Sequence, residues 1–373
     1  MERWCLAAIC VAGMSVVPAP SWASPLDRAR VDREAAWIVH VDMERLRESP
    51  VGCSVLTERT GFPGSMFRDL HSDLGLDPST EINALTAYAL HRESASDSND
   101  SVVLISSTSA ADGLPKFMQE AHPETFEFSR EGDATLLSWT VEDSRWFLCV
   151  KTPDNPVERI VVLSRSRECI ASALSVLGGG RASLARTTDP AESPSTLAWP
   201  YDQDPARGSI AFVAANRSMW GNRGTSSPAF RGATGIVLDL REQHDDSGDR
   251  WTQLSAKVRM DTDQAAEQME SVAKGALAWL ALSAQKAESP ESCCKALSSA
   301  APVRVGSEVA LDVKVNSQEL ATIMDTVRTV HSPNTIHGRT DGSSKTENED
   351  RNGGVTKHAA PAKNSVSSTP SRK

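Results

Sequence analysis

The sequence predicts an exported α+β protein with two similar halves in tandem. Each half is expected to form a largely antiparallel sheet with helices packed on one face, as in ferredoxin-like units. Short stretches of alternating apolar and polar residues predict strands, and capped helical patterns lie between them. The order of these elements before residue 180 recurs after residue 208, although residue identity between the halves is slight, which indicates a structural repeat.

The first half, residues 24–180, begins with the stretch that organises the rest of the chain. Residues 36–42 alternate with the period of a strand, and Asp42 stands where a helix N-cap belongs. Ser49 and Pro50 then provide a second helix start. Further strands are expected at 82–90, 102–106, 135–141, 146–151 and 158–163, and helices at 114–121 and 166–177.

A connection rich in Pro, Thr, Asp and Ala, residues 181–207, leads to the second half, residues 208–330. Strands are expected there at 209–214, 233–240, 251–260 and 302–315, with a polar hairpin at 243–250 and a closing helix at 317–330. The clearest helix of the chain covers residues 264–285. Its apolar residues recur at intervals of three and four and predict one stripe against a sheet face: Ala265, Met269, Val272, Ala273, Ala276, Leu277 and Leu280. Trp279, like most tryptophans of the chain, is expected in the core.

The two ends of the chain do not look like parts of the fold. Residues 1–23 carry an early Arg3, an apolar stretch and a small-x-small pattern ending at Ala23, which are typical of a secretory signal peptide. The apolar stretch is too short to span a bilayer, so no transmembrane segment is predicted in the mature chain. Residues 331–373 have little apolar content and are predicted to form a disordered tail. We therefore expect export to the periplasm, the cell envelope or the medium.

Charge and motif content narrow the classes of function. The net charge is -10 and no basic face is interleaved with aromatics, which argues against nucleic-acid binding. The chain has no G-x-S-x-G, P-loop or G-x-G-x-x-G motif, and no cofactor is predicted. The favoured function is a non-catalytic binding or structural protein of the periplasm or cell envelope, with a protein or another envelope component as its partner. The sequence does not indicate an oligomeric state.

A metal-dependent hydrolase is the first alternative. His40 and Asp42 are two residues apart on a predicted strand and so share a face, and His71 and Asp73 form a second His-x-Asp in an expected loop. Together they would make a mixed imidazole and carboxylate metal site. The competing interpretation is structural, because Asp42 already serves as a helix cap and His40 suits a hydrogen bond inside the fold.

The cysteines suggest a second alternative, a redox protein. Cys293 and Cys294 are adjacent in a polar connection, and a disulfide between neighbours is strained, so a bond from one of them to Cys169 is equally plausible. No C-x-x-C spacing supports a redox motif.

Four aromatic residues lie where strands do not require them. Trp199 and Tyr201 fall in the connection, and Trp220 and Phe230 fall in a Gly/Ser-rich loop. Exposed loop aromatics are typical of binding surfaces, while packing of these loops against the sheet is the structural alternative.

One resemblance supports export and the repeated architecture. The run Ala-Ala-Trp-Ile-Val-His-Val-Asp-Met-Glu-Arg-Leu-Arg-Glu-Ser-Pro-Val-Gly at 35–52 follows directly on the signal-like segment, and Arg-Ile-Val-Val-Leu-Ser-Arg-Ser at 159–166 precedes a helix. Both resemble uncharacterised secreted proteins of planctomycete-type bacteria, over most of residues 30–330. The resemblance implies no activity and assigns no role to any residue.

Overall fold

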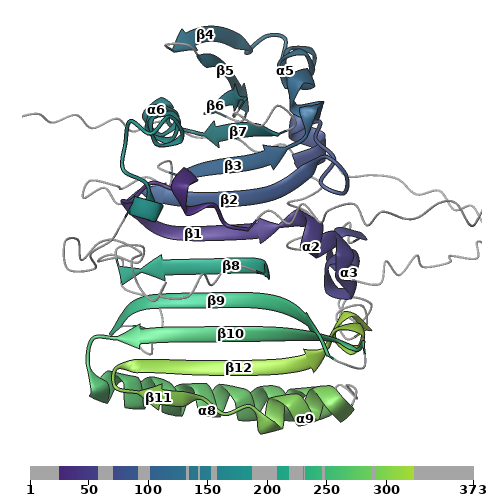
Figure 1. Cartoon of the computed structure of the whole chain (residues 1–373), viewed down its shortest axis with the longest axis vertical. Helices are drawn as coiled ribbons and strands as arrows, with labels where there is room; N and C mark the ends of the chain where they lie inside the picture. The colour runs from purple at the N-terminus through teal and green to yellow at the C-terminus, as the bar shows by residue number, and fades with distance from the viewer. Residues whose placement is uncertain are drawn as a thin grey trace, which may run out of the picture. The chain divides into compact units, whose positions relative to one another are not determined.

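Alternating apolar and β-branched residues form twelve antiparallel strands in the described part of the chain, and all twelve belong to one sheet (Figure 1). The computed structural model describes residues 25–57, 70–90, 101–131, 134–141, 143–152, 158–186, 208–217, 230, 232–245, 248–286 and 291–322. The described residues all belong to one compact unit. The predicted mixture of helices with a largely antiparallel sheet is therefore confirmed.

Most predicted elements are present with bounds close to those expected. The strands are β1 (Ala35–Asp42), β2 (Ile82–Leu90), β3 (Ser101–Ser107), β4 (Glu127–Glu131), β5 (Ala134–Val141), β6 (Ser144–Lys151), β7 (Arg159–Ser164), β8 (Ser209–Asn216), β9 (Ala233–His244), β10 (Arg250–Met260), β11 (Val303–Val305) and β12 (Glu308–Asn316). The helices are α2 (Met43–Glu48), α3 (Pro50–Thr57), α5 (Leu114–Ala121), α6 (Arg167–Leu177), α8 (Asp263–Lys286) and α9 (Glu291–Ser299), with short 3-10 turns η1 (Arg28–Arg30), η2 (Ser109–Gly113) and η3 (Leu184–Arg186). Strand β4 was not predicted, because its sequence lacks an alternating apolar pattern.

The contact between β1 and β8 joins the two expected halves into one sheet. The strand order is β11-β12-β10-β9-β8-β1-β2-β3-β7-β6-β5-β4, and β1 pairs with β8 in antiparallel register from Trp37 opposite Ala215 to Val41 opposite Ala211. The expectation of a separate sheet in each half is therefore wrong. The physical reason is that β1 and β8 would each be an edge strand with unpaired backbone groups, and their mutual pairing satisfies both edges.

Helices cover both faces of the sheet in the first half, where only one covered face was expected. Along β7, Ile160 and Val162 enter a core with α6, whereas Val161 and Leu163 enter a second core with α2 and α5 on the opposite face. This difference follows from composition. The run from Ile160 to Leu163 has no polar side, and a strand of that kind is stable only when both of its faces are buried.

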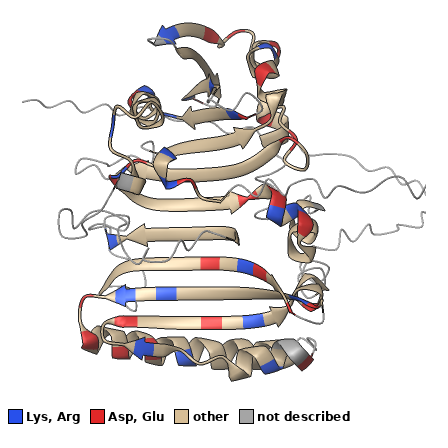
Figure 2. Cartoon of the chain, in the orientation of Figure 1, with Lys and Arg blue, Asp and Glu red and all other residues tan. Residues whose placement is uncertain are grey.

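The second half has a covered face and a polar face. On the covered face, α8 packs through a small core that includes Ala266, Met269 and Val309. Charged residues lie in the middle of β9, β10 and β12, while β1, β2, β3 and β8 have none at mid-strand (Figure 2). The paired Arg259 and Glu308 alternate with Val258 and Val309, which face α8, so these charges lie on the other face. Asp239 there is buried and accepts hydrogen bonds of 2.5 Å from Ser209 and from Arg241.

The long helix α8 is less buried than its apolar pattern predicted. Val272, Trp279 and Leu280 are 47%, 67% and 42% exposed, although all three were expected in the core. The apolar residues of α8 extend around more of the helix than the sheet covers. At 3.6 residues per turn, Val272 and Trp279 share one side of the helix, and Ala266 and Leu277, which are buried, lie on another. The sheet covers only the second side.

The corner between α2 and α3 confirms both predicted helix starts. Asp42 caps α2 by accepting from the backbone N–H groups of Glu44 and Arg45 at 3.1 and 3.0 Å. Ser49 ends α2 and begins α3, because its hydroxyl donates to the Leu46 carbonyl at 3.1 Å and accepts from the Gly52 N–H at 2.8 Å. This double use of Ser49 makes the turn between the helices very tight.

The predicted signal peptide and tail fall on residues 1–23 and 331–373, which lie outside the described residues. Within the described part of the chain, none of the helices has both the length and the hydropathy needed to cross a membrane.

Candidate functional site

The four residues of the predicted metal site are not brought together as ligands. His40 is 1% exposed on β1, and its Nδ1 lies 2.9 Å from Oγ1 of Thr86 on the neighbouring β2. Asp42, also buried, has its Oδ1 engaged by the cap of α2. His71 and Asp73 lie on an exposed helical segment, residues 70–74, and not in the expected loop.

Within the described ranges, no three His, Cys, Asp or Glu side chains are grouped so that they could hold a metal ion. The structure therefore does not group His40, Asp42, His71 and Asp73 as the predicted metal site requires. Its two buried members serve the sheet and the helix cap, and its two exposed members lie apart from them on a helix surface.

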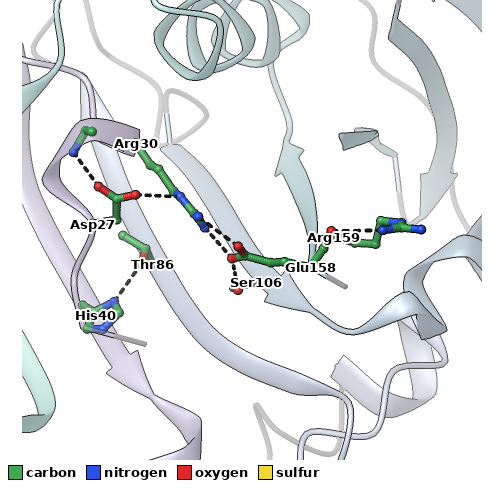
Figure 3. A network of polar contacts seen from close by, with 8 residues as sticks. Asp27, Arg30, His40, Thr86, Ser106, Glu158 and Arg159 are labelled. Atoms are coloured by element: carbon green, nitrogen blue, oxygen red, sulfur yellow. Dashed lines mark hydrogen bonds and ion pairs between the residues drawn. The ribbon is translucent and has the colours of Figure 1, made fainter. Parts of the chain in front are cut away.

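A polar network near His40 is structural in character (Figure 3). Arg30 donates from Nη1 and Nη2 to the two carboxylate oxygens of Glu158 at 2.6 and 3.0 Å, and its Nε lies 2.9 Å from Asp27. The Ser106 hydroxyl donates to the same Glu158 at 2.6 Å. These hydrogen bonds lower the pKa of Glu158, with that from Arg30 as the largest cause. The network attaches the segment before β1 to β3 and β7.

The predicted cysteine pairing is contradicted for one of the two candidate partners. Cys169 is fully buried on α6, in the core between this helix and the sheet, and Cys294 is half-buried on α9. The two cysteines are not bonded to each other. Because Cys169 is packed in the core between α6 and the sheet, its thiol is not accessible to a cysteine in a distant part of the chain. The side chain of Cys293 lies outside the described residues.

The predicted aromatic binding surface is largely outside the structure described. Trp199, Tyr201 and Trp220 fall on residues whose structure is not described. Phe230 is half-buried and packs against the small core under α8, which favours the structural alternative for this residue.

A cleft of about 470 Å³ lies where α2 meets the ends of three strands. Figure 1 shows α2 and α3 at the same end of the sheet as the turn between β9 and β10. The cleft is lined by side chains of both charges and one apolar residue: Arg45 and Glu48 from α2, Ile210 from β8, Glu242 and His244 from β9, and Arg250 from β10. Its volume falls in the range of small-molecule sites.

One wall of the cleft is fixed by Arg250. Its Nη1 donates to the Glu48 carbonyl at 2.6 Å and lies 3.9 Å from Oε2 of Glu242. The Glu242 side chain is only 11% exposed, and its Oε1 is buried without a hydrogen-bond partner. A buried carboxylate oxygen without a donor is costly, and a rotation of the Glu242 side chain toward a ligand donor in the cleft would relieve that cost.

Another wall of the cleft is formed by Arg45, which contacts Asp42, the N-cap of α2. Nε of Arg45 lies 3.4 Å from Oδ2 of Asp42, which makes no hydrogen bond of its own. Burial raises the pKa of Asp42, and the N–H and the positive charge of Arg45 oppose that rise. The Arg45 side chain is 38% exposed, so its guanidinium remains accessible from the cleft.

Sequence reasoning did not find this cleft, although its residues fell in stretches that it did consider. Arg45 and Glu48 lie inside the run 35–52. Glu242 borders the expected polar hairpin at 243–250, and His244 lies within it. The hairpin is shorter than predicted, since β9 continues to His244 and β10 begins at Arg250. The alternation Glu242-x-His244 was the available signal, because residues two apart on a strand share a face.

Comparison of the chain with family models, with curated proteins and with solved structures gave no match.

Proposed function

We propose that the chain is an exported, non-catalytic binding protein whose ligand site is the cleft between α2 and the β8-β9-β10 strand ends. The observation that carries the proposal is the charged lining of this cleft, in which two arginines stand beside Glu242, a carboxylate with one oxygen, Oε1, that accepts no hydrogen bond. Such a site is built for a polar ligand that supplies a donor to Glu242 and an acceptor to the guanidinium groups.

The charges of the lining indicate the class of ligand. Arg45 and Arg250 carry positive charge and Glu48 and Glu242 carry negative charge, so the lining is balanced when His244 is neutral. A zwitterion complements separated charges of both signs better than an anion or a cation alone. We therefore favour a free amino acid or the charged ends of a short peptide, both of which bear an α-ammonium donor and a carboxylate acceptor.

A thermal-shift panel followed by calorimetric titration tests this function. The panel consists of free amino acids and dipeptides, and the matched N-acetyl amides, which lack both charges, serve as control ligands. We expect a zwitterion to raise the melting temperature and its blocked counterpart to have no effect. Arg250→Gln should weaken binding by about 10- to 100-fold, the effect of losing one charge-assisted hydrogen bond.

Arg259→Gln is the matched control for this experiment. Arg259 is 43% exposed, close to the 44% of Arg250, and it contacts Glu308 on β12 instead of the cleft. Its substitution should leave affinity unchanged. Equal binding of zwitterionic and blocked compounds, or equal weakening by both arginine substitutions, would refute the cleft as the site.

We also propose that the two halves are structural repeats. Reading outward from the β1–β8 contact, the strand order is β1-β2-β3-β7 on one side and β8-β9-β10-β12 on the other. In each half, a helix on the same face follows the third strand, α5 in the first half and α8 in the second. Superposition of the two sets of four strands tests the repeat, and it is refuted if α5 does not then fall on α8.

Export remains part of the proposal. The signal-like residues 1–23 and the resemblance of residues 35–52 to secreted planctomycete-type proteins support it. N-terminal sequencing of the protein recovered from a bacterial host should give a mature chain starting at Ser24, and recovery of the chain with Met1 intact would contradict export.

A further inference from the structure

The outward side of α8 carries a stripe of exposed apolar side chains. Trp279 and Leu282 are 67% and 58% exposed, Val272 is 47% exposed, and Gly275 lies between them on the same side. Figure 1 shows α8 at one border of the sheet, next to β11 and β12. Several large apolar side chains exposed on one helix face indicate an interaction surface.

The stripe itself carries no charge. No Asp, Glu, Lys or Arg occurs between Lys274 and Lys286. At 3.6 residues per turn, Glu270 and Lys274 lie on the side of α8 away from Val272 and Trp279, so covering the stripe desolvates no ionised side chain. Glu270 of α8 pairs with Lys274 at 2.7 Å along the helix and also contacts Arg304 at 3.3 Å. A partner with a strongly charged surface is therefore disfavoured, and an apolar helix face fits better.

The stripe is complementary to itself. If a second α8 lies antiparallel across the first with the two-fold axis at residue 277, Val272 faces Leu282 of the other copy and Gly275 faces Trp279 of the other copy. A methyl group built on Gly275 would have no neighbour within 4 Å, so there is open space beside this residue. The large Trp279 side chain thus meets a vacant position, and it does so twice because the contact is symmetric.

We propose that α8 is a homodimer interface, in which two copies of the chain pair through antiparallel α8 helices with each Trp279 seated over Gly275 of the other copy. A helix of 24 residues is about 36 Å long. A single helix pair buries less than the roughly 800 Å² per partner of a standard stable interface. The dimer is accordingly reversible, with a dissociation constant on the order of micromolar.

Sedimentation equilibrium of the full chain, from about 1 to 100 µM so as to span that constant, tests the proposal. We expect a monomer–dimer equilibrium in the unsubstituted protein. Trp279→Glu should remain monomeric over the whole range, a loss of at least about 100-fold in affinity, because it places two charges in the apolar contact. Gln264→Glu introduces the same charge on the same helix outside the paired stretch and should dimerise normally.

Gly275→Trp separates the proposed packing from general adhesiveness. This substitution adds apolar surface, so an unspecific contact would be kept or strengthened, whereas the proposed dimer would lose the space for Trp279 and become monomeric. Circular dichroism of each variant verifies that the fold is retained. The proposal would be overturned if the unsubstituted protein were monomeric, or if either Trp279→Glu or Gly275→Trp formed dimers. Binding of the monomer to phosphatidylglycerol vesicles through Trp279 would also overturn it.

Discussion

Replacing Gly52 by alanine should destabilise the protein, although the same change in most helices is stabilising. Gly52 is the third residue of α3, directly after the tight corner at Ser49. A methyl group at this position would lie far inside contact with the carbonyl oxygen of Leu46 and 2.8 Å from Cγ of the same residue. The obstacle is backbone, which cannot swing aside as a flexible side chain can.

The expected magnitude combines two opposing effects. Alanine gains about 1 kcal/mol over glycine from helix propensity. Overpacking a rigid contact costs about 1–3 kcal/mol and more when backbone must shift. Because Leu46 is part of the core under α2, the clash dominates, and we expect a net loss of about 2 kcal/mol in the free energy of unfolding.

Chemical denaturation followed by circular dichroism measures this change, and Gly275→Ala is the matched control. Gly275 is also inside a helix, but an added methyl group there meets no atom within 4 Å, so this variant should gain up to about 1 kcal/mol. The two glycine substitutions should therefore differ in sign. If Gly52→Ala is as stable as Gly275→Ala, the account of the α2–α3 corner is wrong.

Two further predictions concern carboxylates with structural hydrogen bonds, the partly buried Glu158 and the buried Asp42. Glu158→Gln should lower the free energy of unfolding at pH 7 by about 1–2 kcal/mol, since it weakens the hydrogen bonds to Arg30. The pKa of Glu158 is lowered in the fold, so its contribution is full above the usual glutamate pKa and is lost as the pH falls through the folded pKa. Urea midpoints down to about pH 3 should then converge, and a difference that is independent of pH would contradict this. Asp42→Ala should cost about 1–2 kcal/mol through loss of the α2 cap, whereas Asp42→Asn keeps the accepting Oδ1 and should cost less; equal losses in thermal melts would exclude the cap as the cause.

Local sequence signals predicted the local structure well. Asp42 and Ser49 were recognised as caps, and alternation placed most of the strands, because these features depend on neighbours in the chain. The prediction that helices cover only one face of the sheet in the first half was wrong for a different reason. The run from Ile160 to Leu163 is apolar on both sides, and only the packed structure shows that two helical layers cover it.

The cleft could not be predicted because it depends on a contact between distant segments. Arg45 and Glu242 are brought together only by the pairing of β1 with β8, which no local pattern specifies. The predicted metal ligands are not grouped for a related reason. His40 and Asp42 do share a face as predicted, but that face is inside the fold, where their side chains already have structural partners.

Calorimetric titration of the purified protein with the zwitterion selected by the thermal-shift panel tests the central claim most directly, with Glu242→Gln measured beside it. The account predicts saturable binding of one ligand per chain and at least about a tenfold loss of affinity in Glu242→Gln, since an amide accepts a hydrogen bond from an ammonium group less strongly than a carboxylate. Unchanged affinity in Glu242→Gln, or no saturable binding by any zwitterion, would contradict a binding function for the cleft.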